Sequence, residues 1–252
     1  GPFCDRDFFD RKYGPGNWRP LPRHTVTQDD KERPIDDGKA GGHNMFSSLT
    51  ETIVNQHADL PVAIVRFYLQ CLFHVLSSIF EFVKSTSDVL HFFPDLILLM
   101  GTEDFWKGYR QNHTTSDHAA FTIITFVHPQ TGKRVYASLF GLPFGLSSVV
   151  LQFNRHPQLI TAVCRRIFRL IVAHYFDDSL QAEIRRLAGH TKRLFLRIVD
   201  MMGIIIGHPK RQSMSLMPKF LGRITDFTAL ARTCLVTFTT APHTLSKAHK
   251  II

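Results

Sequence analysis

The spacing of apolar residues along the chain predicts three long helices. Apolar side chains recur at helical spacing from about Leu60 to Val83, and a second helix is expected from Ser147 or Ser148 to about Phe168, kinked or restarted at Pro157. A third periodic helix is predicted after Asp178, ending near Gly203, with these residues on one side: Leu180, Ile184, Leu187, Leu194, Ile198 and Met201. Residues 1–45 are rich in Gly, Pro and charge, which favours loops.

Strands are predicted where β-branched and aromatic residues cluster. Phe121–Val127 and Val135–Phe140 would form a hairpin around HPQTGKR, and Leu170–Phe176 a short strand. Leu96–Met100 fits either a helix end or a buried strand. Further short strands are expected in GIII, in KFLGRI and in Cys234–Thr239. This order of elements predicts an α+β fold.

The most apolar stretch, Val62 to Val83, is interpreted as a buried amphipathic helix. It contains Arg66, Gln70, His74 and Glu81, which a lone membrane helix would tolerate poorly. No membrane partner is therefore expected. The four cysteines show no paired spacing, which favours a reducing, intracellular compartment, either cytoplasm or nucleus.

The charge balance favours a polyanionic partner. The chain has 30 Lys and Arg against 21 Asp and Glu, a formal net charge of +9. Basic surface releases counterions when it meets phosphates, although many basic proteins bind no nucleic acid. Charge alone does not assign a function.

Three aspartates lie next to the ends of apolar segments. Asp104 follows Leu96–Met100, and Asp177 and Asp178 follow Leu170–Phe176. Carboxylates in such places repel one another unless a cation neutralises them. If the two strands are neighbours, the three carboxylates would converge and hold two Mg²⁺ ions about 3.5–4 Å apart, an arrangement that serves nucleotidyl transfer. The alternative interpretation is that these aspartates lie in two solvated turns and hold no ion.

A series of segments resembles, in the right order, the motifs of the reverse transcriptase family. The segments are KERPIDDGKAGGHN (31–44) for the fingers, followed by DFWKGYRQ (104–111), GLPFGLSSVVLQFNR (141–155), YFDD (175–178), GIIIGHPKRQ (203–212) and KFLGRITDF (219–227). The 141–155 segment is closer to long-terminal-repeat or tyrosine-recombinase retroelements than to non-LTR or group II intron enzymes, whose motif usually carries Pro-Gln-Gly. A set of motifs in the family's order is a far more specific signal than any one of these motifs alone.

The resemblance implies the fingers and palm of a right-hand polymerase, with a small antiparallel palm sheet backed by helices. The expected boundaries are fingers at 1–100, palm at 101–112, a fingers hairpin at 113–142, palm at 143–230 and the start of a thumb or connection at 231–252. The thumb would be largely absent, since TAPHTLSKAHKII resembles only its beginning.

The resemblance also implies roles for particular residues. Asp104, Asp177 and Asp178 would be the catalytic carboxylates and metal ligands, with the Phe105 carbonyl as an extra ligand. Tyr109 would be the steric gate against a ribose 2′-hydroxyl. Other residues would contact the nucleotide or its phosphates: Arg33, Lys31, Phe144, Gly145 and Lys210, with Leu142 and Pro143 shaping the same turn. Leu221 and Gly222 would grip the primer.

The expected function is RNA-directed DNA synthesis by a nucleotidyltransferase. It would use two Mg²⁺ ions, with Mn²⁺ as a possible substitute, an RNA or DNA template with its primer, and dNTPs. One alternative is a catalytically silent retroelement fragment that at most binds nucleic acid. Another is an RNA-dependent RNA polymerase, against which Tyr109 argues, because such enzymes usually offer a polar residue to the ribose hydroxyl.

Overall fold

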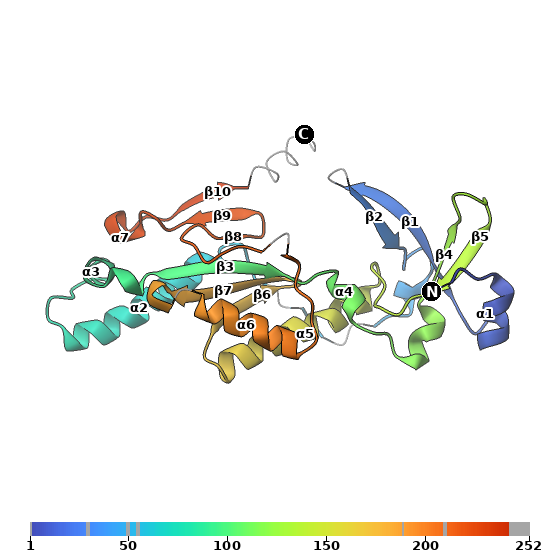
Figure 1. Ribbon diagram of the computed structural model, residues 1–252, viewed down its shortest axis with the longest axis horizontal. Coiled ribbons are helices and arrows are strands. Elements are labelled where there is room, and N and C mark those ends of the chain that lie inside the picture. Colours follow the sequence, from blue (N-terminus) through green and yellow to red (C-terminus); the bar gives the residue numbers. More distant parts are fainter. Residues whose placement is uncertain are drawn as a thin grey trace. The chain divides into compact units, whose positions relative to one another are not determined.

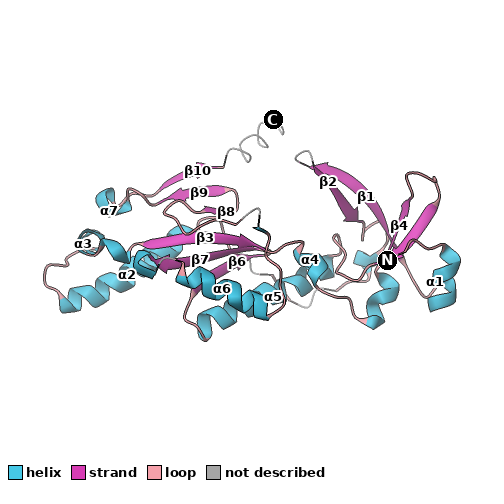
Figure 2. Ribbon diagram, in the orientation of Figure 1, coloured by secondary structure: helices cyan, strands magenta, loops and turns pink. Residues whose placement is uncertain are grey.

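The computed structural model describes residues 2–28, 31–48, 51–53, 56–187, 189–208 and 211–241, except for the side chains of Gln28 and Lys31. The chain forms two compact units. The first unit comprises Gly1–Ile53 and Lys107–His156, and the second comprises Val54–Trp106 and Pro157–Ile252. Helices and several small sheets are mixed along the chain, which confirms the predicted α+β class (Figure 2).

The first unit is built on a four-stranded sheet with the order β2-β1-β4-β5 (Figure 1). Its elements are α1 (Arg6–Tyr13), β1 (Pro20–Gln28), β2 (Lys31–Asp36), η1 (His43–Met45), α4 (Gly108–Gln111), η3 (Ser116–Phe121), β4 (Ile123–Val127) and β5 (Arg134–Ser138), with the first part of α5 (Ser147–Arg166). The hairpin predicted around HPQTGKR is confirmed as the antiparallel pair of β4 and β5.

The expectation that residues 1–45 are mostly loops is wrong. They contain α1 and the antiparallel hairpin of β1 and β2. Prolines and charged residues made the strand pattern hard to recognise, because Leu21 is the only buried side chain among those that the structure describes in β1. Pro20 and Pro22 lie in the part of β1 that pairs with β4 rather than with β2. Their missing N–H groups therefore break no bond of the hairpin.

An aromatic cluster holds α1 against the first unit's sheet. Phe9, Trp18 and Ile123 are buried together, and Tyr13 and Tyr136 pack against them. The indole N–H of Trp18 donates to the Asp10 carboxylate at 2.8 Å. This satisfied polar group lets a large aromatic side chain remain in the core.

A buried carboxylate, Asp36, joins three segments of the first unit. Arg23 and Arg110 both contact it, with N–O distances of 2.6 and 2.8 Å. The Phe144 amide donates to the same carboxylate at 2.9 Å, and the Asp36 amide donates to the Phe144 carbonyl at 2.9 Å. Asp36 thus fixes β2, α4 and the turn around Gly145 relative to one another.

The second unit contains two three-stranded antiparallel sheets, β3-β7-β6 and β10-β9-β8. Its elements are α2 (Leu60–Ile79), α3 (Thr86–Phe92), η2 (Pro94–Leu96), β3 (Leu98–Asp104), the rest of α5, β6 (Ile171–Tyr175), β7 (Asp178–Ile184), η4 (Arg185–Leu187), α6 (His190–Met201), β8 (Lys219–Phe220), β9 (Arg223–Asp226), α7 (Leu230–Thr233) and β10 (Thr237–Thr240). Leu96–Met100 therefore leads into a strand, one of its two expected forms.

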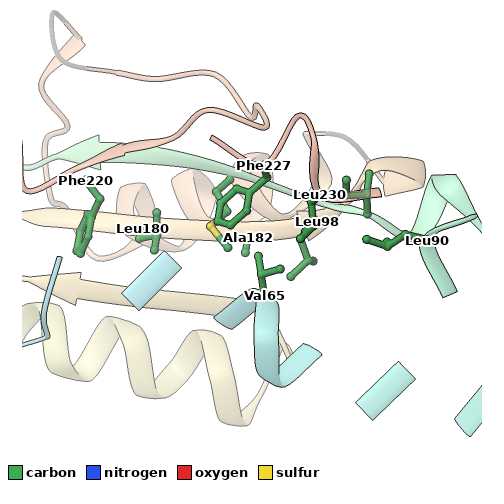
Figure 3. Packing of buried hydrophobic residues seen from close by; sticks show 10 residues of the cluster. Val65, Leu90, Leu98, Leu180, Ala182, Phe220, Phe227 and Leu230 are labelled. Carbon is green, nitrogen blue, oxygen red and sulfur yellow. The ribbon is translucent and has the colours of Figure 1, made fainter. Parts of the chain in front are cut away.

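The two faces of the β3-β7-β6 sheet differ in character. One face carries the apolar side chains of Leu98, Met100, Leu180 and Ala182. Residues of α2, α3, β8, α7 and the segment before α7 pack on it (Figure 3): Val65, Leu90, Phe220, Phe227 and Leu230. The other face carries buried polar groups, including Glu103, Gln181 and Glu183. Helices α5 and α6 contribute partners to this polar face, and Glu183 accepts hydrogen bonds from the Gly189 and Thr191 amides at the start of α6.

The long helix predicted after Asp178 is wrong in its first half. Residues 178–184 form β7, which lies between β3 and β6, and the helix α6 begins only at His190. The spacing of Leu180, Ala182 and Ile184 fits a strand as well as a helix. Pairing of this segment with two neighbouring strands decides in favour of the strand. The predicted helix end is confirmed, since Gly203 follows α6 with a positive φ of 71°.

Other predicted boundaries are partly corrected. Helix α5 continues through Pro157, which excludes the restart, one of the two expected effects of this proline. GIII forms no strand, although Ile206 makes an isolated bridge with Phe105. The strand expected at Cys234–Thr239 is found at Thr237–Thr240, and KFLGRI contributes β8 and the start of β9.

Helix α2 confirms the predicted helix but not its predicted burial. Within it, only Pro61 and Val65 are buried, while Phe67 and Ile79 are 69% and 63% exposed. By length and composition alone, α2 is apolar enough to cross a membrane, a test that core helices of soluble proteins also pass. One side of α2 packs on the core and the other side carries exposed apolar groups.

The turn at Gly145 provides a test of this architecture. Gly145 has a φ of 133°, and a Cβ there would collide with the Asp36 carbonyl. We expect Gly145→Ala to lower the free energy of unfolding by on the order of 3 kcal/mol, because strain and a backbone clash add. Gly132→Ala is the matched control, since Gly132 also has a positive φ, 64°, but nothing within 4 Å. It should cost about 1 kcal/mol. Equal losses in urea unfolding would contradict this assignment.

Candidate functional site

The structure brings Asp104 and Asp178 together at one end of the β3-β7-β6 sheet. They are directly opposite each other in the antiparallel register of β3 and β7. Side chains so paired have Cβ atoms about 4.5–5.5 Å apart, and like charges there repel. Asp104 is buried, at 9% exposure. This end of the sheet therefore brings two carboxyl side chains close together.

Asp177 lies in the two-residue turn that joins β6 to β7. The turn is formed by Phe176 and Asp177, and Phe176 has a left-handed φ of 50°. Such a conformation is unusual for a bulky residue and is found where the surrounding structure imposes it. The Phe105 amide donates to the Asp177 carbonyl at 3.0 Å, which ties the turn to the end of β3.

A cleft of about 530 Å³ opens beside these carboxylates within the second unit. Its lining includes Asp104 and Asp178 together with Leu221 and Gly222. Leu221 and Gly222 form the turn between β8 and β9, and both have positive φ values, 50° and 76°. Two such residues in a two-residue hairpin are typical of a type I′ turn. The predicted primer-gripping turn thus lines the same cleft as two of the predicted catalytic carboxylates.

Gln212 holds the β8–β9 hairpin in this position. Its side chain accepts from the Lys219 amide at 3.0 Å and donates to the Lys219 carbonyl at 2.9 Å, as a neighbouring strand would. Its own amide donates to the Thr102 carbonyl of β3 at 3.0 Å. Sequence reasoning missed Gln212 as a site residue, although it ends the motif GIIIGHPKRQ.

A buried ion triad lies on the opposite face of β3. Glu103 is 1% exposed, and its carboxylate contacts Lys192 of α6 at 2.9 Å and Arg211 at 3.1 Å. A buried charge without its partners would lower the stability of the fold. The three side chains therefore hold α6 and the segment around Arg211 against β3. Arg211 and Lys219 also line the cleft. Neither the triad nor these two cations was predicted as part of the site.

His174 lies in β6, three residues before Asp177, and faces helix α5. Its Nδ1 atom and the Thr161 hydroxyl are 2.9 Å apart. Burial, and secondly the charge of Arg165, lower the pKa of His174 to about 4. The ring is therefore neutral near pH 7.

Five of the six residues predicted to bind the nucleotide, all except Lys210, belong to the first unit. The Tyr109 ring stacks on Phe153 at 4.6 Å between centroids and meets Phe144 edge-on at 5.4 Å. These contacts fix the ring's orientation. Arg33 is exposed on β2, and Gly145 makes its close approach to Asp36. The side chain of Lys31, all of Lys210 and the predicted thumb segment from Pro242 onward lie outside the described residues.

The donor atoms at Asp104, Asp177 and Asp178 suit a hard divalent cation. Carboxylate oxygens are the ligands that Mg²⁺ prefers, and opposed carboxylates favour a bound cation. In the part of the chain that the structure describes, no group of three or more His, Cys, Asp or Glu side chains is already arranged to hold a metal ion. The donor chemistry fits, while a complete ligand set would require these side chains to turn toward one ion.

Comparisons with known proteins identify the fold. No model of a known protein family and no curated protein sequence matches the chain. Among solved structures, a foamy viral protease-reverse transcriptase in complex with double-stranded DNA is similar with a TM-score of 0.58 and 18% identity, over 92% of this chain and 32% of that one. The same viral protein in complex with an RNA/DNA hybrid is similar with a TM-score of 0.56 and 17% identity, over 92% and 25%.

The chain therefore has a reverse transcriptase-like fold. It spans between a quarter and a third of these neighbours' length. At this level of identity the likeness concerns the fold, and the chemistry of the site has to be argued from this chain's own residues.

The lowered pKa of His174 predicts a pH dependence of stability. Between about pH 6.5 and 4 the unfolded chain binds a proton on His174 and the folded chain does not, so stability falls as the pH falls through this range. After allowance for partial exposure, we expect a loss of roughly 1–2 kcal/mol from this group. His174→Gln should remove that part of the dependence in urea unfolding at pH 7.5 and 4.5. His156→Gln, at an exposed position of α5, should leave it intact; a similar change in both variants would contradict the assignment.

Proposed function

We propose that this chain is the fingers and palm of an RNA-directed DNA polymerase, which extends a primer with dNTPs. In this proposal the fingers comprise residues 1–100 and 113–142, the palm comprises 101–112 and 143–230, and a thumb or connection begins at 231–252. The observation that carries it is the pairing of Asp104 with Asp178 beside the Leu221–Gly222 turn, in a reverse transcriptase-like fold. The nucleic acids in the neighbouring complexes, double-stranded DNA and an RNA/DNA hybrid, are the kinds of substrate that we propose.

Asp104, Asp177 and Asp178 would hold the divalent ions of the reaction, with the Phe105 carbonyl as a further oxygen donor. Bound Mg²⁺, or Mn²⁺ in its place, would lower the pKa of the primer 3′-hydroxyl and stabilise the charge of the leaving pyrophosphate. The protein contributes position: the strand pairing sets Asp104 opposite Asp178, and the hydrogen bond from the Phe105 amide to the Asp177 carbonyl holds the turn that carries Asp177.

The remaining residues of the cleft would handle the primer and the phosphates. Gly222 has no side chain, which allows a strand to approach the backbone of the turn closely. Arg211 and Lys219 line the cleft and would add positive charge for the phosphates there. Arg33, Lys31 and Lys210 would add charge on the triphosphate side.

Tyr109 would exclude ribonucleotides. Its ring is held by Phe153 and Phe144, so it cannot easily turn aside for a 2′-hydroxyl. This favours a DNA polymerase over an RNA polymerase. We further propose a retroelement origin of the LTR or tyrosine-recombinase kind, from the LPFG segment, and an intracellular location.

Primer extension tests the catalytic carboxylates. With oligo(dT) annealed to poly(rA) and Mg²⁺, Asp177→Asn and Asp104→Asn should each reduce dTTP incorporation by on the order of 10³-fold, because ion binding is lost. Asp95→Asn, an exposed carboxylate in η2, is the matched control and should extend normally. Equal melting temperatures of the three variants would exclude unfolding as the cause.

The same assay separates the proposal from a silent remnant. If the wild-type chain incorporates no more dTTP than Asp177→Asn in either Mg²⁺ or Mn²⁺, while it still binds the primed template, the silent nucleic-acid-binding fragment is the correct interpretation.

Sugar selection tests Tyr109. We expect Tyr109→Val to lower the ratio of kcat/KM for dTTP to that for UTP by on the order of 10²-fold, because space opens for the 2′-hydroxyl. Tyr109→Phe keeps the ring and should keep the ratio. A wild-type enzyme that prefers UTP would favour the RNA polymerase alternative.

A further inference from the structure

An arginine-rich segment lies at the end of the β3-β7-β6 sheet remote from Asp178. The pair Ile171–Ala182 closes the register of β6 and β7, so the residues just before Ile171 lie beside those just after Ala182. The Arg185 amide donates to the Ile97 carbonyl at 2.9 Å, which holds η4 to the same edge. We define the arginine patch as Arg166, Arg169, Arg185 and Arg186, all exposed.

The positive charge of the arginine patch is not compensated within the described part of the chain. None of its four guanidinium groups forms an ion pair there. Within the described residues, Glu183 accepts hydrogen bonds from the Gly189 and Thr191 amides, and Asp95 of η2, which is exposed, forms no ion pair. Like charges gathered without partners favour binding of an anion.

Exposed apolar side chains are interleaved with these arginines. Phe168, in the sequence Arg-Arg-Ile-Phe-Arg, is 42% exposed, and Ile167 is 68% exposed. Arginine meets phosphate oxygens in a bidentate manner, and an exposed ring accepts the face of an unpaired base. The combination of several guanidinium groups with an aromatic platform is typical of surfaces that bind single-stranded nucleic acid.

The arginine patch is distinct from the carboxylate cleft. Asp178 begins β7 and Arg185 follows its last residue, so the two are separated by seven residues, about 23 Å at 3.3 Å per residue.

We propose that the arginine patch binds single-stranded nucleic acid, with phosphates on the four arginines and a base stacked on Phe168. The inference rests on the nucleic-acid substrate of the proposed function and adds a second contact for it, outside the cleft. An acidic protein segment is the competing partner, and the experiment separates the two.

Oligonucleotide binding provides the test, with fluorescein-labelled dT12 and rU12 as probes at 50–300 mM NaCl. Each lost phosphate contact reduces the slope of log K against log salt by about 0.7, so Arg185→Gln/Arg186→Gln should flatten it by about 1.4. Phe168→Ala should weaken binding by on the order of 5- to 100-fold and leave the slope unchanged, because stacking carries no charge. Arg66→Gln/Lys84→Gln removes the same charge from exposed positions of the same unit and should keep the wild-type slope.

Two outcomes would overturn the inference. One is unchanged oligonucleotide binding in both patch variants. The other is normal oligonucleotide binding with lost affinity for a polyglutamate peptide, which would assign the patch to an acidic protein segment. Primer extension on a short primed template tests the proposed function independently, and the patch variants should extend at the wild-type level. Absence of extension by the wild-type chain would refute the polymerase proposal and leave the conclusion on oligonucleotide binding unchanged.

Discussion

The register between β3 and β7 is the constraint on which the second unit depends. Because side chains alternate along a strand, this register places Asp104 and Asp178 on the face that carries the apolar core and the cleft. It places Glu103 on the other face, toward Lys192. A slip of one residue would exchange these faces and turn Glu103 toward the apolar core, away from Lys192. The core and the ion triad therefore select the same pairing.

Buried carboxylates play a similar part in both units. Asp36 in the first unit is held by Arg23 and Arg110, and Glu103 in the second by Lys192 and Arg211. Removing one partner of such a group leaves an uncompensated buried charge. Each carboxylate thus fixes neighbouring segments that carry motif residues, and stability and positioning depend on the same contacts.

Much of the fold could be predicted because local pattern and tertiary environment agree. Helix α2 and the β4–β5 hairpin are examples, since their residues have one dominant period. The pattern was ambiguous at Leu180, Ala182 and Ile184, where a helix was expected and β7 is found. The strands of residues 20–36 were missed because a mostly exposed hairpin carries little apolar alternation. Burial of α2 was wrongly expected, because the apolar content of a helix does not say how many of its sides are covered.

By itself, the sequence determined the residue types available for chemistry and their order: three aspartates at the ends of apolar segments, a tyrosine in the first motif and a glycine after Phe144. These are properties of local composition and spacing. Only the tertiary structure decided that Asp104 lies opposite Asp178, that Gln212 hydrogen-bonds to the Lys219–Gly222 hairpin and that Arg110 forms an ion pair with Asp36. Such contacts join residues far apart in the chain, and their partners are selected by strand register and by the need to neutralise buried charge, which no short stretch of sequence encodes.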